Sequence, residues 1–188
     1  FVRKCEENGI TFIGPSAEIM ERMGDKINSK KVANKVGVAT IPGVEKVIKS
    51  AEEAKEVADE IGYPIMIKAS NGGGGRGMRG VYDEKNLALE YTTACSESKK
   101  AFGEELIFIE KYIEDPKHIE VQILGDKHGN LVHLYERDCS VQRRHQKIIE
   151  YAPAFSVDKK VREEICSDAV KIAKEVGYVS AGTLEFLV

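Results

Sequence analysis

The 188-residue chain contains no tryptophan and only four cysteines, which are Cys5, Cys95, Cys139 and Cys166. None of these cysteines forms a Cys-x-x-Cys pair, so the sequence indicates neither a zinc knuckle nor a dense disulfide framework. Free thiols are typical of cytoplasmic proteins, and we expect a cytoplasmic location. The sequence also lacks an apolar run of membrane-spanning length, so we expect no membrane partner.

An excess of one charge is lacking as well. The 28 lysines and arginines are balanced by 31 aspartates and glutamates, for a net charge of −3. Arg76, Arg79 and the basic residues of segment 136–147 would suit a nucleic acid. The balancing acids and the scarcity of interleaved aromatics argue against one, and we expect no nucleic-acid partner. The Walker A pattern, with lysine after the glycines, is also absent.

Glycine, by contrast, is concentrated in one place. Five glycines fall within residues 72–77, just after the apolar segment 65–69, which contains Lys68. A lysine in an apolar strand is costly to bury unless its ammonium meets an anion. Neighbouring glycines can turn their backbone N–H groups toward a ligand. The pattern favours a nucleotide-phosphate site under a strand–loop–strand lid, and the alternative is a mobile hairpin whose lysine extends into solvent.

Capping residues and apolar spacing predict alternating helices and strands. Helices are expected over residues 2–8, 16–23, 25–35, 51–61, 84–101 and 158–176. Strands are expected over residues 10–13, 65–69, 78–82, 106–110, 118–124, 131–138 and 182–188. Lys26 falls in the first turn of its helix, where the dipole disfavours a cation. It is therefore either a solvated surface lysine or one that meets an anionic ligand.

Segment 136–147 is the second informative stretch. It is too polar for a core strand and lacks the apolar spacing of an amphipathic helix. Its arginines and lysine suit anions, because a guanidinium offers a bidentate fork and an ammonium a point charge. The alternative is a solvated loop. Strand 118–124 carries His118, Glu120 and Gln122 on one face, which is either solvent-exposed or part of a site.

Five segments together resemble the biotin carboxylase domain of biotin-dependent carboxylases: residues 68–78, 110–112, 118–122, 136–147 and 181–186. The resemblance implies an α+β chain with the ATP-grasp fold, truncated at both ends. Residues 1–40 would be the end of the N-terminal domain with linker helices, residues 41–112 the lid subdomain, and residues 113–188 the first part of a larger antiparallel-sheet subdomain. Within the family, segments 125–134 and 178–188 are most similar to pyruvate carboxylases.

The implied reaction is the phosphorylation of bicarbonate by ATP and the transfer of CO2 to biotin on a carrier domain. The resemblance implies Mg2+ as cofactor, with Mn2+ as an alternative. It also implies a biotinylated carrier domain, a carboxyltransferase and a homo-oligomeric parent protein. The acceptor stays open between pyruvate and the acyl-CoA substrates of acetyl-CoA and propionyl-CoA carboxylases. Alternatives of other classes are a non-catalytic nucleotide-binding module and another ATP-grasp ligase.

The resemblance also assigns residues to roles. The nucleotide would be held by Lys26, Lys68, Gly73, Gly74, Gly75, Met78, Glu110, Lys111, Ile113, His118 and Gln142. The catalytic residues would be His145 near the phosphates, Lys147 at the bicarbonate and Glu185 as a magnesium ligand. This division of labour suits phosphoryl transfer, which depends on positioning and charge neutralisation.

Both ends of the chain fall inside predicted elements, Phe1 in a helix and Val188 in a strand. We therefore expect a piece of a longer protein. The resemblance places a second magnesium-binding carboxylate, and the arginines that hold bicarbonate and biotin, beyond Val188. For this piece alone we expect weak nucleotide binding and little or no carboxylation.

Overall fold

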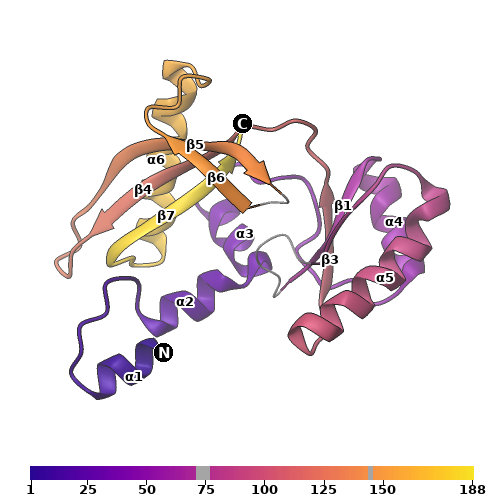
Figure 1. The fold of residues 1–188 in the computed structure, drawn as a ribbon, viewed down its shortest axis with the longest axis horizontal. Coiled ribbons are helices and arrows are strands. Elements are labelled where there is room, and N and C mark those ends of the chain that lie inside the picture. The colour runs from indigo at the N-terminus through magenta and orange to yellow at the C-terminus, as the bar shows by residue number, and fades with distance from the viewer. Residues whose placement is uncertain (71–76, 144–145) are drawn as a thin grey trace.

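The computed structural model describes residues 1–70, 77–143 and 146–188, which form two lobes (Figure 1). The helices are α1 (Val2–Glu7), α2 (Ala17–Gly24), α3 (Lys26–Lys35), α4 (Ala51–Ile61), α5 (Glu84–Phe102) and α6 (Lys159–Glu175). The strands are β1 (Ile65–Ala69), β2 (Met78–Val81), β3 (Ile107–Lys111), β4 (His118–Gly125), β5 (Leu131–Arg143), β6 (Gln146–Tyr151) and β7 (Ser180–Leu187). No helix in these described ranges is long and apolar enough to cross a membrane.

The first lobe is an antiparallel sheet of order β2-β1-β3 with α4 and α5 on one face (Figure 1). Ile65 and Ile67 are fully buried against the helices, together with Ile107 and Ile109 of β3. Because successive side chains of a strand point to opposite faces, Lys68 lies on the open face. Glu110 shares that face, since its partner Met66 is two residues from Lys68 on β1.

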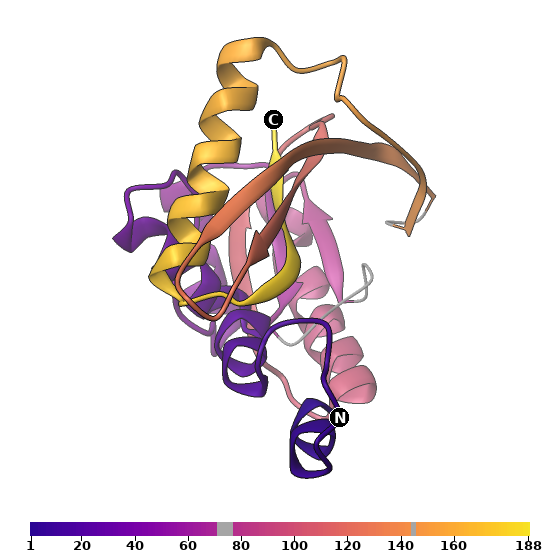
Figure 2. The same cartoon turned by 90° about the vertical axis from the view of Figure 1, so that its left-hand side faces the viewer.

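The second lobe is an antiparallel sheet of order β6-β5-β4-β7. Helix α6 lies along one face, as Figure 2 shows. Ile119, Val121 and Ile123 of β4 are buried on that face, in one cluster with Ala169 and Ala173 of α6. The opposite face of β4 carries Glu120 and Gln122, so the alternation predicted for this strand is confirmed.

Helix α3 connects the two lobes in space (Figure 1). Val32 and Ala33 pack in a cluster with Ile172 and Val176 at the end of α6. On the other side, the Lys30 ammonium lies 3.6 Å from Oε2 of Glu110 in the first lobe. One short helix therefore contacts the second lobe through apolar groups and the first lobe through a charge. The boundaries expected at residues 40 and 112 remain a prediction.

Most predicted elements are confirmed, several with their starting caps. The side chains of four predicted N-cap residues accept a hydrogen bond from a backbone N–H in the first turn of their helices: Ser16, Asp25, Ser50 and Asp83. Strand β1 and helix α4 have the predicted bounds. The predicted C-terminal strand begins two residues earlier than expected, at Ser180.

The strand predicted over residues 10–13 is wrong. These residues are irregular, and the side chains of Ile10 and Ile13 are 60% and 83% exposed. The Ile10 N–H donates to the Cys5 carbonyl at 2.9 Å, which closes the end of α1 instead of joining a sheet. A run of apolar residues this short is ambiguous without a partner strand to pair with.

The strand predicted over residues 131–138 is too short, because β5 continues to Arg143 and β6 follows it. The solvated-loop interpretation of segment 136–147 is therefore wrong for its described residues; Arg144 and His145 lie outside them. Register shifts between Asp138 and Val141 bend the β5–β6 pair. The polar residues fit a strand because they pair across the sheet, as Arg137 does with Glu120.

The linker before α4 runs antiparallel beside β3 and approaches it closely at Gly43. Gly43 forms an isolated bridge with Glu110, and the Lys111 N–H donates to the Pro42 carbonyl at 2.7 Å. A Cβ atom at Gly43 would lie 2.7 Å from the Glu110 Cβ and 2.7 Å from the Ile109 carbonyl oxygen. Only glycine fits this close approach of the two backbones without a backbone shift.

We therefore predict that Gly43→Ala lowers the free energy of unfolding by about 1–3 kcal/mol, because the added methyl group is too close to the backbone of β3. Urea denaturation measures the change. Gly24→Ala is the matched control, since a Cβ there has nothing within 4 Å, and we expect no loss. Equal stability of the two variants would show that the contact between Gly43 and β3 is not tightly packed.

Candidate nucleotide and anion site

A buried carboxylate and three lysines gather on the open face of the first lobe. Glu110 is 5% exposed, and its Oε1 accepts a hydrogen bond from the Lys68 ammonium. Its Oε2 lies 3.6 Å from the Lys30 ammonium, which also donates to the Ile41 carbonyl at 2.6 Å. The Lys68 ammonium therefore meets a carboxylate within the chain, and its binding to a nucleotide phosphate stays a prediction.

Lys26 adds a further positive charge. It is the first residue of α3, where Asp25 caps the helix by accepting from the Ile27 N–H at 2.8 Å. Burial and repulsion by Lys68 lower the pKa of Lys26, and attraction by Glu110 and Glu185 opposes this. Lys26 is therefore a half-buried cation facing other charges, and its contact with an anionic ligand stays a prediction. A cation at a helix N-terminus suits an anion, which both the lysine and the backbone N–H groups attract.

A cavity of about 690 Å³ opens beside these charges, between α3, α6 and β7. Its volume is in the range of small-molecule sites. Apolar residues form most of its wall, including Val38, Ile41, Ile113, Leu184 and Leu187. The charged residues that line it are Lys30, Glu110 and Glu185. The structure therefore brings three predicted residues to one cavity, namely Glu110, Ile113 and Glu185.

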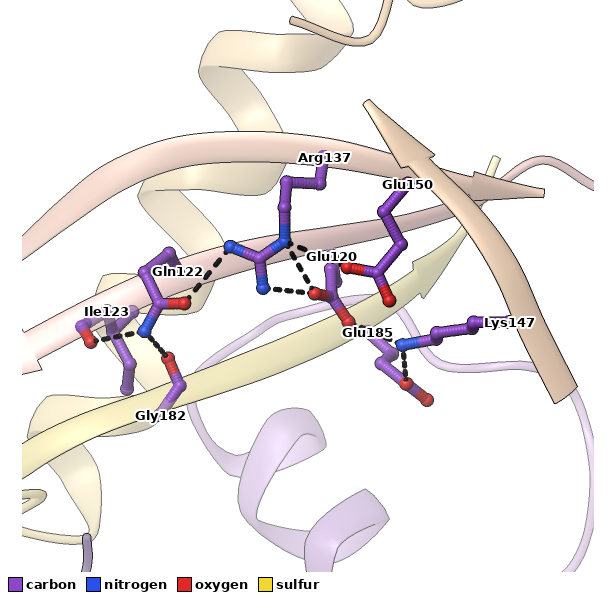
Figure 3. A network of polar contacts seen from close by, with 8 residues as sticks. All are labelled: Glu120, Gln122, Ile123, Arg137, Lys147, Glu150, Gly182 and Glu185. Carbon is purple, nitrogen blue, oxygen red and sulfur yellow. Dashed lines mark hydrogen bonds and ion pairs between the residues drawn. The ribbon is translucent and has the colours of Figure 1, made fainter. Parts of the chain in front are cut away.

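A second buried carboxylate organises the open face of the second lobe (Figure 3). Glu120 is 5% exposed and accepts from the Arg137 Nε at 2.8 Å and from the Lys147 ammonium. Lys147 also donates to Glu185 Oε1 at 2.5 Å. Gln122 extends the network, because its Oε1 accepts from Arg137 at 3.1 Å. Lys147 and Glu185, both predicted as catalytic, are thus held together.

The network fixes the charge states of its members. Burial alone would raise the pKa of Glu120, but the hydrogen bonds from Lys147 and Arg137 outweigh it and lower that pKa. Burial would lower the pKa of Lys147, but the hydrogen bonds to Glu120 and Glu185 outweigh it and raise that pKa. At neutral pH, Lys147 is therefore a cation and Glu120 an anion. A lysine with a raised pKa suits anion binding better than proton abstraction.

A cysteine lies among these charges. Ligand atoms of Glu120, Cys139 and Glu150 lie within 4.8 Å of one another. Burial, with a further contribution from Glu120, raises the pKa of the Cys139 thiol to about 11. The thiol therefore stays protonated at neutral pH, and the thiolate is the form that binds metals. Since Glu120 already accepts from two cations, these three residues are poorly suited to a metal ion.

The other predicted site residues surround these two carboxylates. Met78 is the cross-strand partner of Lys68. His118 begins β4, and its N–H donates to Ser140 Oγ at 3.0 Å. The Gln142 amide donates to the Cys139 carbonyl at 2.9 Å, and its cross-strand partner is Lys147.

One predicted ammonium points elsewhere. Lys111 donates to the carbonyls of Gly62 and Tyr63 at 3.0 and 2.9 Å, so its side chain ties β3 to the loop before β1. Four further predicted residues lie outside the described residues: Gly73, Gly74, Gly75 and His145.

Sequence reasoning assigned no role to Lys30, Glu120 or Arg137, although it placed Glu120 on a strand face that is either solvent-exposed or part of a site. A signal existed for the first two. Lys30 is four residues after Lys26 in a predicted helix, a spacing that places two side chains on one face. Glu120 is two residues after His118 in a predicted strand and thus shares its face. Arg137 lies in the polar segment 136–147, but its pairing with Glu120 depends on the register between β4 and β5.

The family comparison agrees with this geometry. The sequence model of the family described as carbamoyl-phosphate synthase L chain, ATP binding domain, matches residues 25–188. The chain belongs to this family. Its α+β architecture is the ATP-grasp fold as found in biotin carboxylases, so the resemblance noted in the sequence is confirmed.

Individual relatives match over the whole of this chain. The mouse protein named "Pyruvate carboxylase, mitochondrial" is 53% identical over 188 residues, which are 100% of this chain and 16% of the mouse protein. A structure of a biotin carboxylase–β-γ-ATP complex from Campylobacter jejuni is 52% identical with a TM-score of 0.95, over 100% of this chain and 42% of that one. The chain therefore spans less than half the length of these relatives.

A third relative is the biotin carboxylase domain dimer of Hydrogenobacter thermophilus 2-oxoglutarate carboxylase, in complex with MgADP, ADP and bicarbonate. Its structure is 55% identical with a TM-score of 0.93, over 99% of this chain and 41% of that one. This relative is therefore similar to the chain in sequence as well as in fold.

A buried aspartate anchors the bent part of β5 beside this site. Asp138 is 1% exposed, and it accepts hydrogen bonds from the Ser156 hydroxyl at 2.7 Å, the Tyr151 hydroxyl at 2.9 Å and the Ser140 N–H at 2.9 Å. Burial alone would raise the pKa of Asp138, but these hydrogen bonds hold it at about 2. Because this folded-state pKa lies below the ordinary value, the carboxylate stabilises the fold above about pH 4, and the stabilisation is lost as the pH falls toward 2.

We predict that Asp138→Asn lowers the free energy of unfolding by about 2 kcal/mol at pH 7, and that the difference from wild type shrinks between about pH 4 and pH 2. Urea denaturation at a series of pH values measures both effects. Exposed Asp59→Asn on α4 is the matched control and should change stability little at any of these pH values. A pH-independent loss in the Asp138 variant would contradict the charged, hydrogen-bonded state assigned to this carboxylate.

Proposed function

We propose that this chain is the ATP-binding part of a biotin carboxylase, which uses ATP and bicarbonate to carboxylate biotin on a carrier domain. The observation that carries the proposal is a set of cations held by two glutamates that line an apolar-walled cavity: Lys68 hydrogen-bonds to Glu110, and Lys147 hydrogen-bonds to Glu185. Lys26 lies close enough to both glutamates for them to affect its pKa. Phosphoryl transfer to bicarbonate requires polyphosphate and a small anion to meet, and fixed cations lower the repulsion between them.

In this proposal Lys26 and Lys68 bind the phosphates, and the apolar wall at Ile113 receives the adenine. Met78, the cross-strand partner of Lys68, covers the adenine from β2. Glu110 and Lys111 contribute through the main chain of β3, because both side chains are engaged in hydrogen bonds within the protein. His118 and Gln142 lie toward the ribose and phosphates. Gly73, Gly74 and Gly75 would close over the phosphates, and His145 would approach them.

Lys147 is the proposed bicarbonate ligand. Its ammonium is fixed between Glu120 and Glu185, and its raised pKa keeps it charged. Glu120, held by Arg137, aims this ammonium at the open face. The chain's contribution to the reaction is then to hold the anion against the phosphate and to keep a positive charge beside it.

Glu185 is the proposed magnesium ligand. Mg2+ prefers hard oxygen ligands, and the exposed carboxylate of Glu185 fits this preference. It lies on β7 beside the cavity, close enough to Lys26 to affect the pKa of that lysine. When bound, Mg2+ or Mn2+ would neutralise negative charge on the phosphates.

The relatives support these ligands without fixing the acceptor. The Hydrogenobacter structure is described as a complex with MgADP and bicarbonate, and the Campylobacter structure as one with a β-γ-ATP ligand. We propose the same classes of ligand here. Relatives named as pyruvate and 2-oxoglutarate carboxylases match similarly well, so the proposed acceptor is a 2-oxo acid, with pyruvate as the first candidate.

The carrier domain, the carboxyltransferase and the homo-oligomeric state are proposed for the parent protein, as is a cytoplasmic location. The Hydrogenobacter relative is described as a dimer, which supports an oligomeric parent. The mouse relative is named as a mitochondrial protein, so location differs within the family and has to be determined for each member.

We predict that Mg-ADP raises the melting temperature of the chain and that Lys68→Met lowers its affinity for Mg-ADP at least about tenfold, because a charge-assisted contact to phosphate is lost. A thermal-shift titration measures both. Lys85→Met, an exposed lysine on α5, is the matched control and should bind like wild type. A wild-type chain that shows no shift at millimolar Mg-ADP would count against the proposed function.

A further inference from the structure

Lys30 has no part in the function proposed above, yet its side chain is largely buried and its ammonium has two polar partners. Its side chain is 12% exposed, compared with 18% for Lys68. The ammonium lies between the Ile41 carbonyl, at 2.6 Å, and Oε2 of Glu110, at 3.6 Å. Burying a lysine is costly, and burial indeed lowers the pKa of Lys30, with Glu110 opposing the shift. The cost of burying this ammonium indicates that Lys30 has a role at this position.

The reason lies in the carboxylate that Lys30 faces. Glu110 is buried and hydrogen-bonds to Lys68 through Oε1. A buried carboxylate that loses a cationic partner is strongly destabilised, so a lone Glu110–Lys68 pair would hold Lys68 tightly. If Lys68 binds phosphate, it has to weaken that pair. A second cation at the other oxygen of Glu110 reduces this cost.

Lys30 is built to be that second cation. It occupies Oε2, whereas Lys68 occupies Oε1, so the two lysines do not compete for one atom. Its hydrogen bond to the Ile41 carbonyl holds the ammonium in place whether or not Lys68 moves. Helix α3 itself is held by Val32 and Ala33 against α6. Lys68, in contrast, lies on the strand that leads into the glycine-rich segment.

We propose that Lys30 is a positioning residue for nucleotide binding: it neutralises Glu110 and thereby releases Lys68 to the phosphates. This inference rests on the proposed function. Lys30 lines the same cavity, but the inference assigns its effect to the neutralisation of Glu110 and not to a contact with the nucleotide or bicarbonate. Its effect on affinity passes through Glu110, and this makes the proposal separable from a purely structural role for the lysine.

The experiment is a calorimetric titration of the chain with Mg-ADP. Lys30→Met should lower the affinity about tenfold, because Glu110 then retains Lys68, whereas Lys30→Arg should stay within about threefold of wild type. Adding Glu110→Gln to Lys30→Met removes the charge that retains Lys68. The double variant should recover to within about threefold of Glu110→Gln alone.

Two controls separate the charge effect from damage to the fold. Lys31→Met, on the exposed side of the same helix, should bind Mg-ADP like wild type. Adenosine, which has no phosphates, should bind Lys30→Met and wild type equally. Circular dichroism establishes that each variant is folded before titration.

The outcomes are distinct. Weak binding by Lys30→Met that Glu110→Gln does not restore would assign Lys30 a structural role and overturn the inference, while the proposed function stands. Binding by Lys30→Met equal to that of Lys31→Met would overturn it in the same way. A wild-type chain that binds no Mg-ADP would overturn both the inference and the proposed function.

Discussion

The ion pairs of Glu110 are the interaction on which the arrangement of this molecule depends. This carboxylate is 5% exposed, and the cations that pair with it come from β1 and from α3. The backbone around it is equally constrained, because the linker at Gly43 runs beside β3 without room for a side chain. Charge and backbone packing therefore meet at one residue, and the open face of the first lobe is built around it.

The second lobe repeats the same solution with different residues. Glu120, as buried as Glu110, lies on the open face of its own sheet and accepts from Arg137 and Lys147. In both lobes a buried glutamate holds lysine ammoniums on the open face, away from the covering helices. Fixed cations of this kind lose little entropy when an anion arrives, since their side chains are already ordered. Each sheet therefore carries ordered cations on its open face, held there by a buried glutamate.

Much of this could be predicted from the sequence, because local signals determined it. The apolar run around Lys68 and the capping residues of the helices set the bounds of β1 and α4 without help from the rest of the chain. The resemblance to biotin carboxylases placed Lys68, Glu110 and Glu185 in one site, and the structure brings them close together.

What could not be predicted depends on register and on long-range packing. Arg137 reaches Glu120 only because β5 pairs with β4 in one alignment, and β6 was missed because polar residues that pair across strands look like a loop. The strand predicted over residues 10–13 was wrong for the opposite reason. These residues have the composition of a strand, but the Ile10 N–H donates a hydrogen bond to the end of α1. Lys30 was overlooked because its partner Glu110 is eighty residues away in sequence, on strand β3 of the first lobe.

The position of α3 has a consequence for movement between the lobes. This helix is fixed to α6 by apolar contacts and reaches Glu110 through Lys30, so the ion pair crosses from one lobe to the other. The backbone also passes between the lobes beside Glu110, at Pro42 and just after Lys111. A hinge axis through this point would let the first lobe swing while its distance from α3 stays constant at the site of the charge.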